Sequence, residues 1–223
     1  MELWLDTLNL DLIKEASHLG ILTGVTTNPS ILSQTDALPE TTIKRLLDIQ
    51  PGYVAAQVVA TELDGIMTQA RKLAKLDKRV IIKIPAHSHG FRAMGLLKKE
   101  DISTLATTIF EPRQILFSAI AGAKYAAPYY GRIEKIEGNA DSVLMAMQDI
   151  VHKQNFPLKI LAAAIYSPTQ LLNCAQAGVA AATVSEKVYN MLFESSKAID
   201  QALEEFENAW QANAQCQSSK LFS

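Results

Sequence analysis

The sequence contains few of the residues that build disulfide-linked, metal-binding or membrane proteins. Two cysteines, Cys174 and Cys216, and four histidines occur among its 223 residues, which excludes a disulfide framework and a zinc-finger spacing. No apolar run reaches the roughly 18–20 residues needed to span a bilayer. The first residues also lack the basic start and the long apolar stretch of a signal peptide. We therefore expect a cytoplasmic protein with no membrane partner.

The sequence also lacks an excess of charge of either sign. Its 21 basic and 23 acidic residues give a net charge of −2, whereas nucleic-acid-binding proteins usually carry a basic face. Hydrophobic residues make up 48% of the chain, which is enough for a large buried core. The composition therefore predicts a globular protein that does not bind nucleic acid.

Short apolar or β-branched runs alternate with longer stretches of helical period. The helical stretch after the second run extends from Pro29 to about Ile49, and a loop around Gly138 follows the sixth run. Successive runs are about 25 residues apart, which leaves room for only short loops in a strand-helix unit. We predict eight strands, near residues 3–6, 24–27, 53–59, 80–84, 104–109, 125–129, 159–164 and 181–184.

Eight strand-helix units with parallel pairing predict an α/β protein of the (β/α)8 TIM-barrel class. The alternative is an open doubly wound sheet, which normally has a glycine-rich loop after its first strand. Residues 6–9 contain no glycine, so we favour the barrel. We assign residues 1–195 to the barrel, 196–213 to an additional amphipathic C-terminal helix, and 214–223 to a flexible polar tail.

Polar side chains occur at the ends of the first six predicted strands, whereas the seventh and eighth strands end in apolar residues. Active sites of TIM barrels lie at the carboxyl ends of the strands, so these polar groups are candidates for chemistry. The candidates are Asp6, Thr26, Thr27, Asn28, Gln57, Lys83, Thr107, Tyr129 and Arg132.

Lys83 is the most informative of these residues because it lies within an otherwise apolar strand, residues 80–85. Parallel strands are covered on both faces, so its amine is expected to be buried. Burial disfavours the ammonium form, and a neutral lysine amine attacks carbonyls to form a Schiff base. The alternative is a lysine that extends to solvent or pairs with a carboxylate.

The other candidates also admit structural roles. Asp6 either caps a helix or forms a salt bridge, or it binds substrate hydroxyls and moves protons. The Gln57 amide forms hydrogen bonds either with structural partners or with a catalytic water. Tyr129 is either an aromatic residue packed at a strand end or a catalytic acid or base. Arg132 is a surface residue or a phosphate-binding fork.

Two further features favour structural roles. His87 and His89 have a spacing that can bind a metal, but no third ligand is apparent, so we expect a solvated pair and no metal site. Cys174 lies among apolar residues of a predicted helix, where we expect it to be part of the core.

Taken together, these motifs resemble the small transaldolase and fructose-6-phosphate aldolase family over nearly the whole chain. The motifs are residues 24–30 (GVTTNPS), residues 80–85 (VIIKIP), and residues 127–129 with 131–133 (APY and GRI). The resemblance implies a class I aldolase-type barrel without metal or other cofactor.

The resemblance also implies a role for each matching residue. Lys83 matches the Schiff-base lysine, and Asp6 and Asn28 match groups that hold substrate hydroxyls. Thr26 matches a residue that supports this loop, Thr107 one near the catalytic water, and Arg132 the phosphate-binding arginine.

Two positions separate the branches of the family that this chain resembles. The aldolase branch has glutamine and tyrosine at the positions of Gln57 and Tyr129, whereas small transaldolases have glutamate and phenylalanine. We therefore expect an aldolase that cleaves or forms fructose 6-phosphate from dihydroxyacetone and glyceraldehyde 3-phosphate or a related aldehyde. Three alternatives remain open: a transaldolase of the pentose phosphate pathway, a metal-dependent aldolase using His87 and His89, and a non-catalytic ring protein that binds sugar phosphates.

The chain departs from the family pattern after the seventh strand. Where the family commonly has Ser-Phe and a basic residue around the substrate phosphate, this chain has Ala164, Ile165 and Tyr166. The phosphate of a sugar substrate would then depend mainly on Arg132. The resemblance further implies a homo-oligomer, a decamer of two pentamer rings, in which the last helix reaches a neighbouring subunit; the alternative is that this helix packs on its own barrel.

Overall fold

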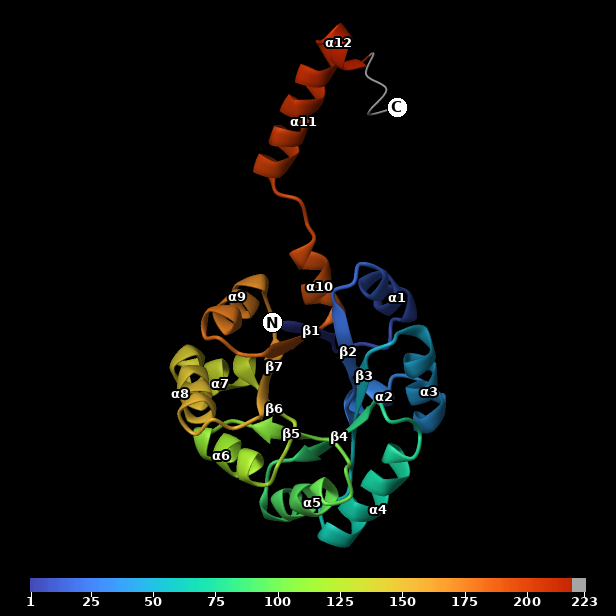
Figure 1. The fold of residues 1–223 in the computed structure, drawn as a ribbon, viewed down its shortest axis with the longest axis vertical. Helices are drawn as coiled ribbons and strands as arrows, with labels where there is room; N and C mark the ends of the chain where they lie inside the picture. The colour runs from blue at the N-terminus through green and yellow to red at the C-terminus, as the bar shows by residue number, and fades with distance from the viewer. Residues whose placement is uncertain (218–223) are drawn as a thin grey trace. The chain divides into compact units, whose positions relative to one another are not determined.

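The computed structural model describes residues 1–217 and contains a closed barrel of eight parallel strands. Each strand pairs with its neighbours in chain order, and β1 closes the barrel by pairing with both β2 and β8 (Figure 1). The predicted TIM barrel is therefore confirmed. The strands are β1 (Glu2–Leu5), β2 (Leu22–Thr26), β3 (Tyr53–Gln57), β4 (Val80–Pro85), β5 (Thr104–Ile109), β6 (Tyr125–Pro128), β7 (Lys159–Ile165) and β8 (Ala181–Val184).

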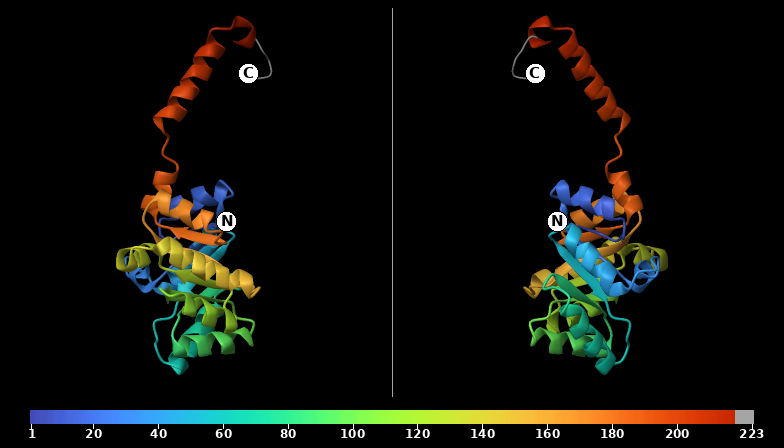
Figure 2. Two further views of the ribbon diagram at one scale, coloured as in Figure 1. Left: turned by 90° about the vertical axis from the view of Figure 1, so that its left-hand side faces the viewer. Right: turned by 90° about the vertical axis from the view of Figure 1, so that its right-hand side faces the viewer.

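The helices that connect one strand to the next lie on the outside of the barrel in all three views (Figures 1 and 2). None of the helices described is long and apolar enough to cross a membrane. The helices are α1 (Leu10–His18), α2 (Pro29–Leu32), α3 (Pro39–Ile49), α4 (Leu63–Ala74), α5 (Ser88–Lys98), α6 (Pro112–Ile120), α7 (Tyr130–Glu137), α8 (Ala140–Lys153), α9 (Pro168–Gln176), α10 (Glu186–Leu192), α11 (Lys197–Gln211) and α12 (Ala214–Gln217).

Side-chain caps and prolines set the start of several helices. The Asn9 side chain accepts hydrogen bonds from the backbone of the first turn of α1, and Ser167 caps α9 in the same way. Pro29 and Pro39 each stand in the first turn of a helix, where a missing N–H costs nothing. The residue before Pro39, Leu38, has an extended ψ of 141°, so the helical stretch expected over 29–49 is interrupted and forms α2 and α3.

The loop expected around Gly138 was wrong for residues 130–137, which form α7. Gly138 ends this helix with φ +68°, the left-handed conformation that favours glycine. Tertiary contacts stabilise α7: the Tyr130 hydroxyl donates to Asp141 on α8 at 2.5 Å, and the Asn173 amide on α9 donates to the Tyr130 hydroxyl at 3.2 Å. Two helices therefore separate β6 from β7.

The barrel interior is filled by large side chains near the amino ends of the strands. The Trp4 ring stacks on Tyr53 with 6.0 Å between centroids and meets the edge of Tyr125 at 5.4 Å. Below them, Glu2 accepts hydrogen bonds from Tyr125 at 2.9 Å and from Lys159 at 2.5 Å. This packing closes the amino end of the barrel, so the opposite end is the one left with room for chemistry.

Contacts divide the chain into two compact units, residues 1–189 and 190–223. Within the second unit, Ser196 caps α11, and no residue of that helix is buried. Ile199, Leu203 and Phe206 form an exposed apolar stripe at three- and four-residue spacing. Residues 214–217 of the expected tail form α12, and its remainder, 218–223, lies outside the described residues.

Strand β6 lies between two irregular strands. The register of β5 against β6 shifts between Ala106 and Ile109, and that of β7 against β8 shifts between Ala162 and Ile165. Each irregularity contains a non-glycine residue with positive φ, Thr108 at +61° in β5 and Ala164 at +54° in β7. Such bulges cluster next to active sites, where they redirect side chains.

The positive φ of Ala164 predicts opposite effects of glycine at two adjacent positions. Ala164→Gly should raise stability by roughly 0.5–1 kcal/mol, because glycine adopts this conformation without a Cβ clash. Ala163→Gly, in the same strand, should lower stability by a similar amount or more, because it adds backbone freedom and removes a methyl group from the core. Thermal unfolding of both variants checks this, and a decrease in melting temperature for both would contradict it.

Candidate active site

Alternation along the strands places one residue of most strands in a ring above the core of the barrel. Successive side chains of a strand point to opposite faces, so the residue two positions after an interior core residue also points inward. The core residues Trp4, Ala55, Ile81, Leu105, Ala127 and Ala181 are followed at this spacing by Asp6, Gln57, Lys83, Thr107, Tyr129 and Thr183. We refer to these six residues and Thr26 as the mouth ring.

Thr183 is the member of the mouth ring that sequence analysis missed. The sequence pattern predicts that β8 ends in the apolar Val184 and contributes no polar group to the site. The alternation from the interior residue Ala181 shows instead that Thr183, one position earlier, faces inward. Counting in steps of two from the core residue would have identified it.

Lys83 is buried in the mouth ring. Its side chain is 5% exposed, and its Nζ donates a hydrogen bond to the Thr27 carbonyl oxygen at 3.3 Å. The alternative in which this lysine extends to solvent is therefore wrong. In the sheet, Lys83 is in register with Gln57 of the neighbouring strand β3.

Asp6 belongs to a short chain of hydrogen bonds with two hydroxyl groups. The Thr26 hydroxyl donates to Asp6 Oδ1 at 2.6 Å and lies 2.8 Å from the Thr183 hydroxyl. Burial raises the pKa of the Asp6 carboxyl, while Lys83 and the bond from Thr26 act in the opposite direction; the net direction is upward. Asn9, not Asp6, caps α1, so the capping role considered for Asp6 was wrong.

Tyr129 is held from several sides at the end of β6. Its hydroxyl lies 3.0 Å from the Thr107 hydroxyl, and its backbone N–H donates to the Ile109 carbonyl at 3.0 Å. Phe110 meets the ring edge-on at 5.5 Å, and the Arg132 guanidinium lies 4.7 Å from the ring centroid. These contacts fix the phenol in the mouth ring with an exposed cation beside it.

Gln57 and Asn28 differ in how their side chains are used. Gln57 Oε1 is buried, and no described protein group donates a hydrogen bond to it. Asn28 Oδ1 accepts the Ile31 N–H at 2.9 Å and so caps α2. A buried amide oxygen needs a donor, so Gln57 is suited to bind a water or a substrate hydroxyl.

The sector of the mouth at β7 has no polar side chain from Ala162, Ala163 or Ala164. Just beyond it, the Tyr166 ring lies against Gly131, where an added Cβ would come within 2.5 Å of the ring and 2.4 Å of the Ala164 carbonyl. The Lys135 amine lies over the Tyr166 ring, 4.8 Å from its centroid. Glycine at position 131 therefore permits the close approach of α7 to the end of β7.

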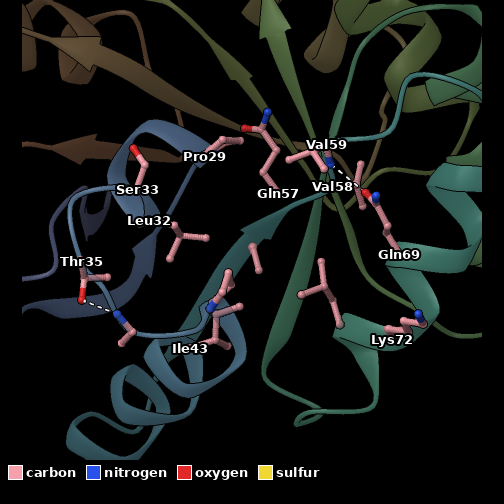
Figure 3. Close-up of a pocket in the computed structure, with 14 residues that line it drawn as sticks. Pro29, Leu32, Ser33, Thr35, Ile43, Gln57, Val58, Val59, Gln69 and Lys72 are labelled. Carbon is pink, nitrogen blue, oxygen red and sulfur yellow. Dashed lines mark hydrogen bonds between the residues drawn. The ribbon is translucent and has the colours of Figure 1, made fainter.

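A pocket lies on the outer side of β3, between α2, α3 and α4 (Figure 3). It has a volume of about 510 Å³, and Gln57 and Pro29 stand at one edge of it. Apart from Ser33, Thr35, Gln57, Gln69 and Lys72, its lining is apolar. We call this feature the β3 groove.

The ring contacts of the two histidines considered as metal ligands are with residues outside the mouth ring. His89 Nδ1 is 3.1 Å from a Glu62 carboxylate oxygen, and the rings of His87 and His89 are 6.1 Å apart. Within residues 1–217, no group of three or more His, Cys, Asp or Glu side chains is arranged to hold a metal ion. Cys174 is fully buried, as expected for a core residue.

Comparisons with known proteins identify the family to which this chain is similar. The family model described as Transaldolase/Fructose-6-phosphate aldolase matches residues 3–221. A "Probable transaldolase" of Coprothermobacter proteolyticus is 37% identical over 210 residues, covering 94% of this chain and 96% of the relative. Another protein of that name, from Thermoanaerobacter sp. (strain X514), is 34% identical over 210 residues, covering 94% and 97%.

Proposed function

Because this chain belongs to the transaldolase/fructose-6-phosphate aldolase family, we propose that it is a Schiff-base (class I) aldolase. The proposed reaction joins dihydroxyacetone to glyceraldehyde 3-phosphate or a related aldehyde, and cleaves fructose 6-phosphate in the reverse direction. The observation that carries the proposal is the buried Lys83 amine, which shares the mouth ring with an acid/base carboxyl and with a hydrogen-bonded phenol.

In the proposed mechanism, Lys83 attacks the ketone carbonyl and, with loss of water, forms an iminium ion. Its positive charge accepts the electron pair released when the C3–C4 bond breaks, leaving an enamine on Lys83 and a free aldehyde. The proton of the C4 hydroxyl must be taken up at this step. Asp6 is suited to take it because burial favours the protonated form of its carboxyl.

The fate of the enamine decides between release and transfer. Protonation of the enamine carbon regenerates an iminium ion, which water hydrolyses to release dihydroxyacetone. Tyr129 can supply this proton because its phenol lies 3.0 Å from the Thr107 hydroxyl, which holds it in place. Gln57 Oε1, buried without a protein donor among the described residues, is suited to position the water.

The second candidate is a transaldolase, which passes the enamine to an acceptor aldehyde before it is protonated. This candidate is favoured by the name "Probable transaldolase" that the relatives carry. The chemistry up to the enamine is the same in both cases. We prefer release because of the phenol of Tyr129.

We also propose how the sugar is held. Thr26 would support the substrate-binding loop after β2 from its buried position, and the Asn28 amide would contact substrate hydroxyls next to Asp6. Arg132, exposed beside the Tyr129 ring, would bind a phosphate, while Ala164 contributes only a methyl group to that side. The proposed substrates are thus small sugars and sugar phosphates, and no cofactor is assigned.

The reaction is tested by trapping the Schiff base. Borohydride added with dihydroxyacetone or fructose 6-phosphate should reduce the iminium ion to a stable secondary amine on Lys83, detected by peptide mass spectrometry. The Lys83→Met variant should form no adduct and lose nearly all activity. Persistent activity in that variant would overturn the mechanism, and sugar binding without an adduct or turnover would instead indicate a non-catalytic binding protein.

Tyr129→Phe separates release from transfer. The variant should still form the Lys83 adduct, but its release of dihydroxyacetone without an acceptor should fall by roughly 10²–10⁴-fold, the usual contribution of a general acid. Transfer to an added acceptor aldehyde should fall much less. The two rates are compared in one assay with and without acceptor, and strict dependence of the wild-type protein on an acceptor would favour the transaldolase.

We further propose that the protein forms a homo-oligomer in the cytoplasm, as a decamer of two pentamer rings. The apolar stripe of α11 is 54–71% exposed, and the largely apolar β3 groove of a second copy offers a surface that could bury it. Lys72 in the groove complements the acidic residues Glu204, Glu205 and Glu207 of α11. Both cysteines are free thiols, as is usual in a reducing compartment.

The oligomer is tested by changing the α11 stripe. Leu203→Glu should reduce the molar mass measured by light scattering, because it places a charge in the proposed apolar contact. Asn208→Glu, which adds the same charge on the opposite face of the helix, is the matched control and should leave the assembly intact. Equal masses for both variants and the wild-type protein would contradict a role for the stripe.

A further inference from the structure

Thr183 is the member of the mouth ring to which neither the family resemblance nor the proposed mechanism gives a role. Its side chain is buried at 4% exposure on β8, next to β1 in the closed barrel. Its hydroxyl oxygen lies 2.8 Å from that of Thr26, which is itself 1% exposed. The two hydroxyls therefore interact in a buried environment, where a hydrogen bond polarises its neighbours strongly.

The number of protons fixes the direction of this chain. A threonine hydroxyl has one proton, and Thr26 donates its proton to Asp6 Oδ1 at 2.6 Å. The proton between the two hydroxyls must then come from Thr183. When the carboxylate is ionised, Thr183 donates to Thr26 and Thr26 donates to Asp6. Both hydrogen bonds must reverse if Asp6 Oδ1 itself becomes the donor.

We propose that Thr183 is a positioning residue whose hydroxyl, acting through Thr26, holds the Asp6 carboxylate ionised and oriented to accept the substrate proton. The inference rests on the proposed function, because it gives Asp6 the role of the base. Thr183 touches no reacting atom in this scheme. By donating to Thr26 it makes that hydroxyl a better donor to the carboxylate.

The groups around Asp6 make the influence of Thr183 on the ionisation of this carboxyl measurable. The neighbouring strands β2 and β8 present the Thr26 and Thr183 hydroxyls, and across the barrel Lys83 is the charged group that acts on the carboxyl. Burial raises the pKa of Asp6, and the two opposing influences are Lys83 and the hydrogen bond from Thr26. Weakening the hydrogen bond from Thr26 reduces one of these two opposing influences. The effects of burial and of Lys83 on the pKa of Asp6 stay unchanged.

The test is the pH dependence of kcat/KM for Thr183→Val, which keeps the shape of the side chain and removes its hydroxyl. Without the Thr183 hydroxyl, Thr26 donates more weakly to the ionised carboxylate, and the pKa of Asp6 rises. The acid limb, which is the low-pH side of the profile where kcat/KM increases with pH, should therefore move to higher pH by about half a unit to one unit. Below the limb the variant should be roughly three- to tenfold slower than the wild-type protein, and at high pH the two rates should converge.

Two control variants make the test decisive. Thr183→Ser, which keeps the hydroxyl, should restore the wild-type limb. Thr104→Val changes a buried threonine of β5 outside the mouth ring and should leave the limb in place. A uniform loss of rate at all pH values in Thr183→Val would overturn the inference, because a merely structural role lowers activity without moving the limb.

The borohydride trap separates this inference from the proposed function. If Lys83 forms the adduct in both the wild-type protein and Thr183→Val, but the acid limb does not move, the proposed function stands and the role of Thr183 is overturned. If the wild-type protein forms no adduct and has no turnover, the proposed function itself fails.

Discussion

Closure of the barrel by pairing β1 with β8 is the constraint on which the rest of the structure depends. In a closed parallel barrel every strand alternates between interior and exterior, so each supplies its inward residues to the same layers. One layer is a packed core around Trp4, and the next forms the mouth ring. Without the β1–β8 pairing, Thr183 and Asp6 would stand at opposite edges of an open sheet, and the hydrogen-bond chain through Thr26 would not exist.

The two sides of the mouth ring follow from different local devices. On the β1, β2 and β8 side, the strand ends bring one carboxyl and two hydroxyls within hydrogen-bonding distance. On the β5–β7 side, two bulges with positive-φ residues, Thr108 and Ala164, flank the short strand β6 that ends at Tyr129. Lys83 on β4 stands between these sides. In the proposed mechanism, this arrangement places the proton acceptor Asp6 on one side of the amine and the proton donor Tyr129 on the other.

Much of this fold could be predicted because its local signals are strong. The strand-helix alternation and the helix start at Pro29 agree with the final structure. The misses were α7 and the interruption before Pro39. For α7, Tyr130 donates a hydrogen bond to Asp141 of α8 and accepts one from Asn173 of α9, and these contacts help to hold a segment that was predicted as a loop. Tertiary contacts commonly override weak local preference in this way.

By itself, the sequence determined that a lysine stands in an apolar strand and that polar residues end six strands of a parallel α/β protein. Those features depend on local pattern and on the period of two. Only the tertiary structure decided which polar groups share the mouth ring with Lys83, that Gln57 Oε1 is buried without a protein donor among the described residues, and that Thr183 joins Asp6 through Thr26. The reason is geometric, because contacts between residues 157 positions apart are set by closure of the barrel and not by neighbouring residues in the chain.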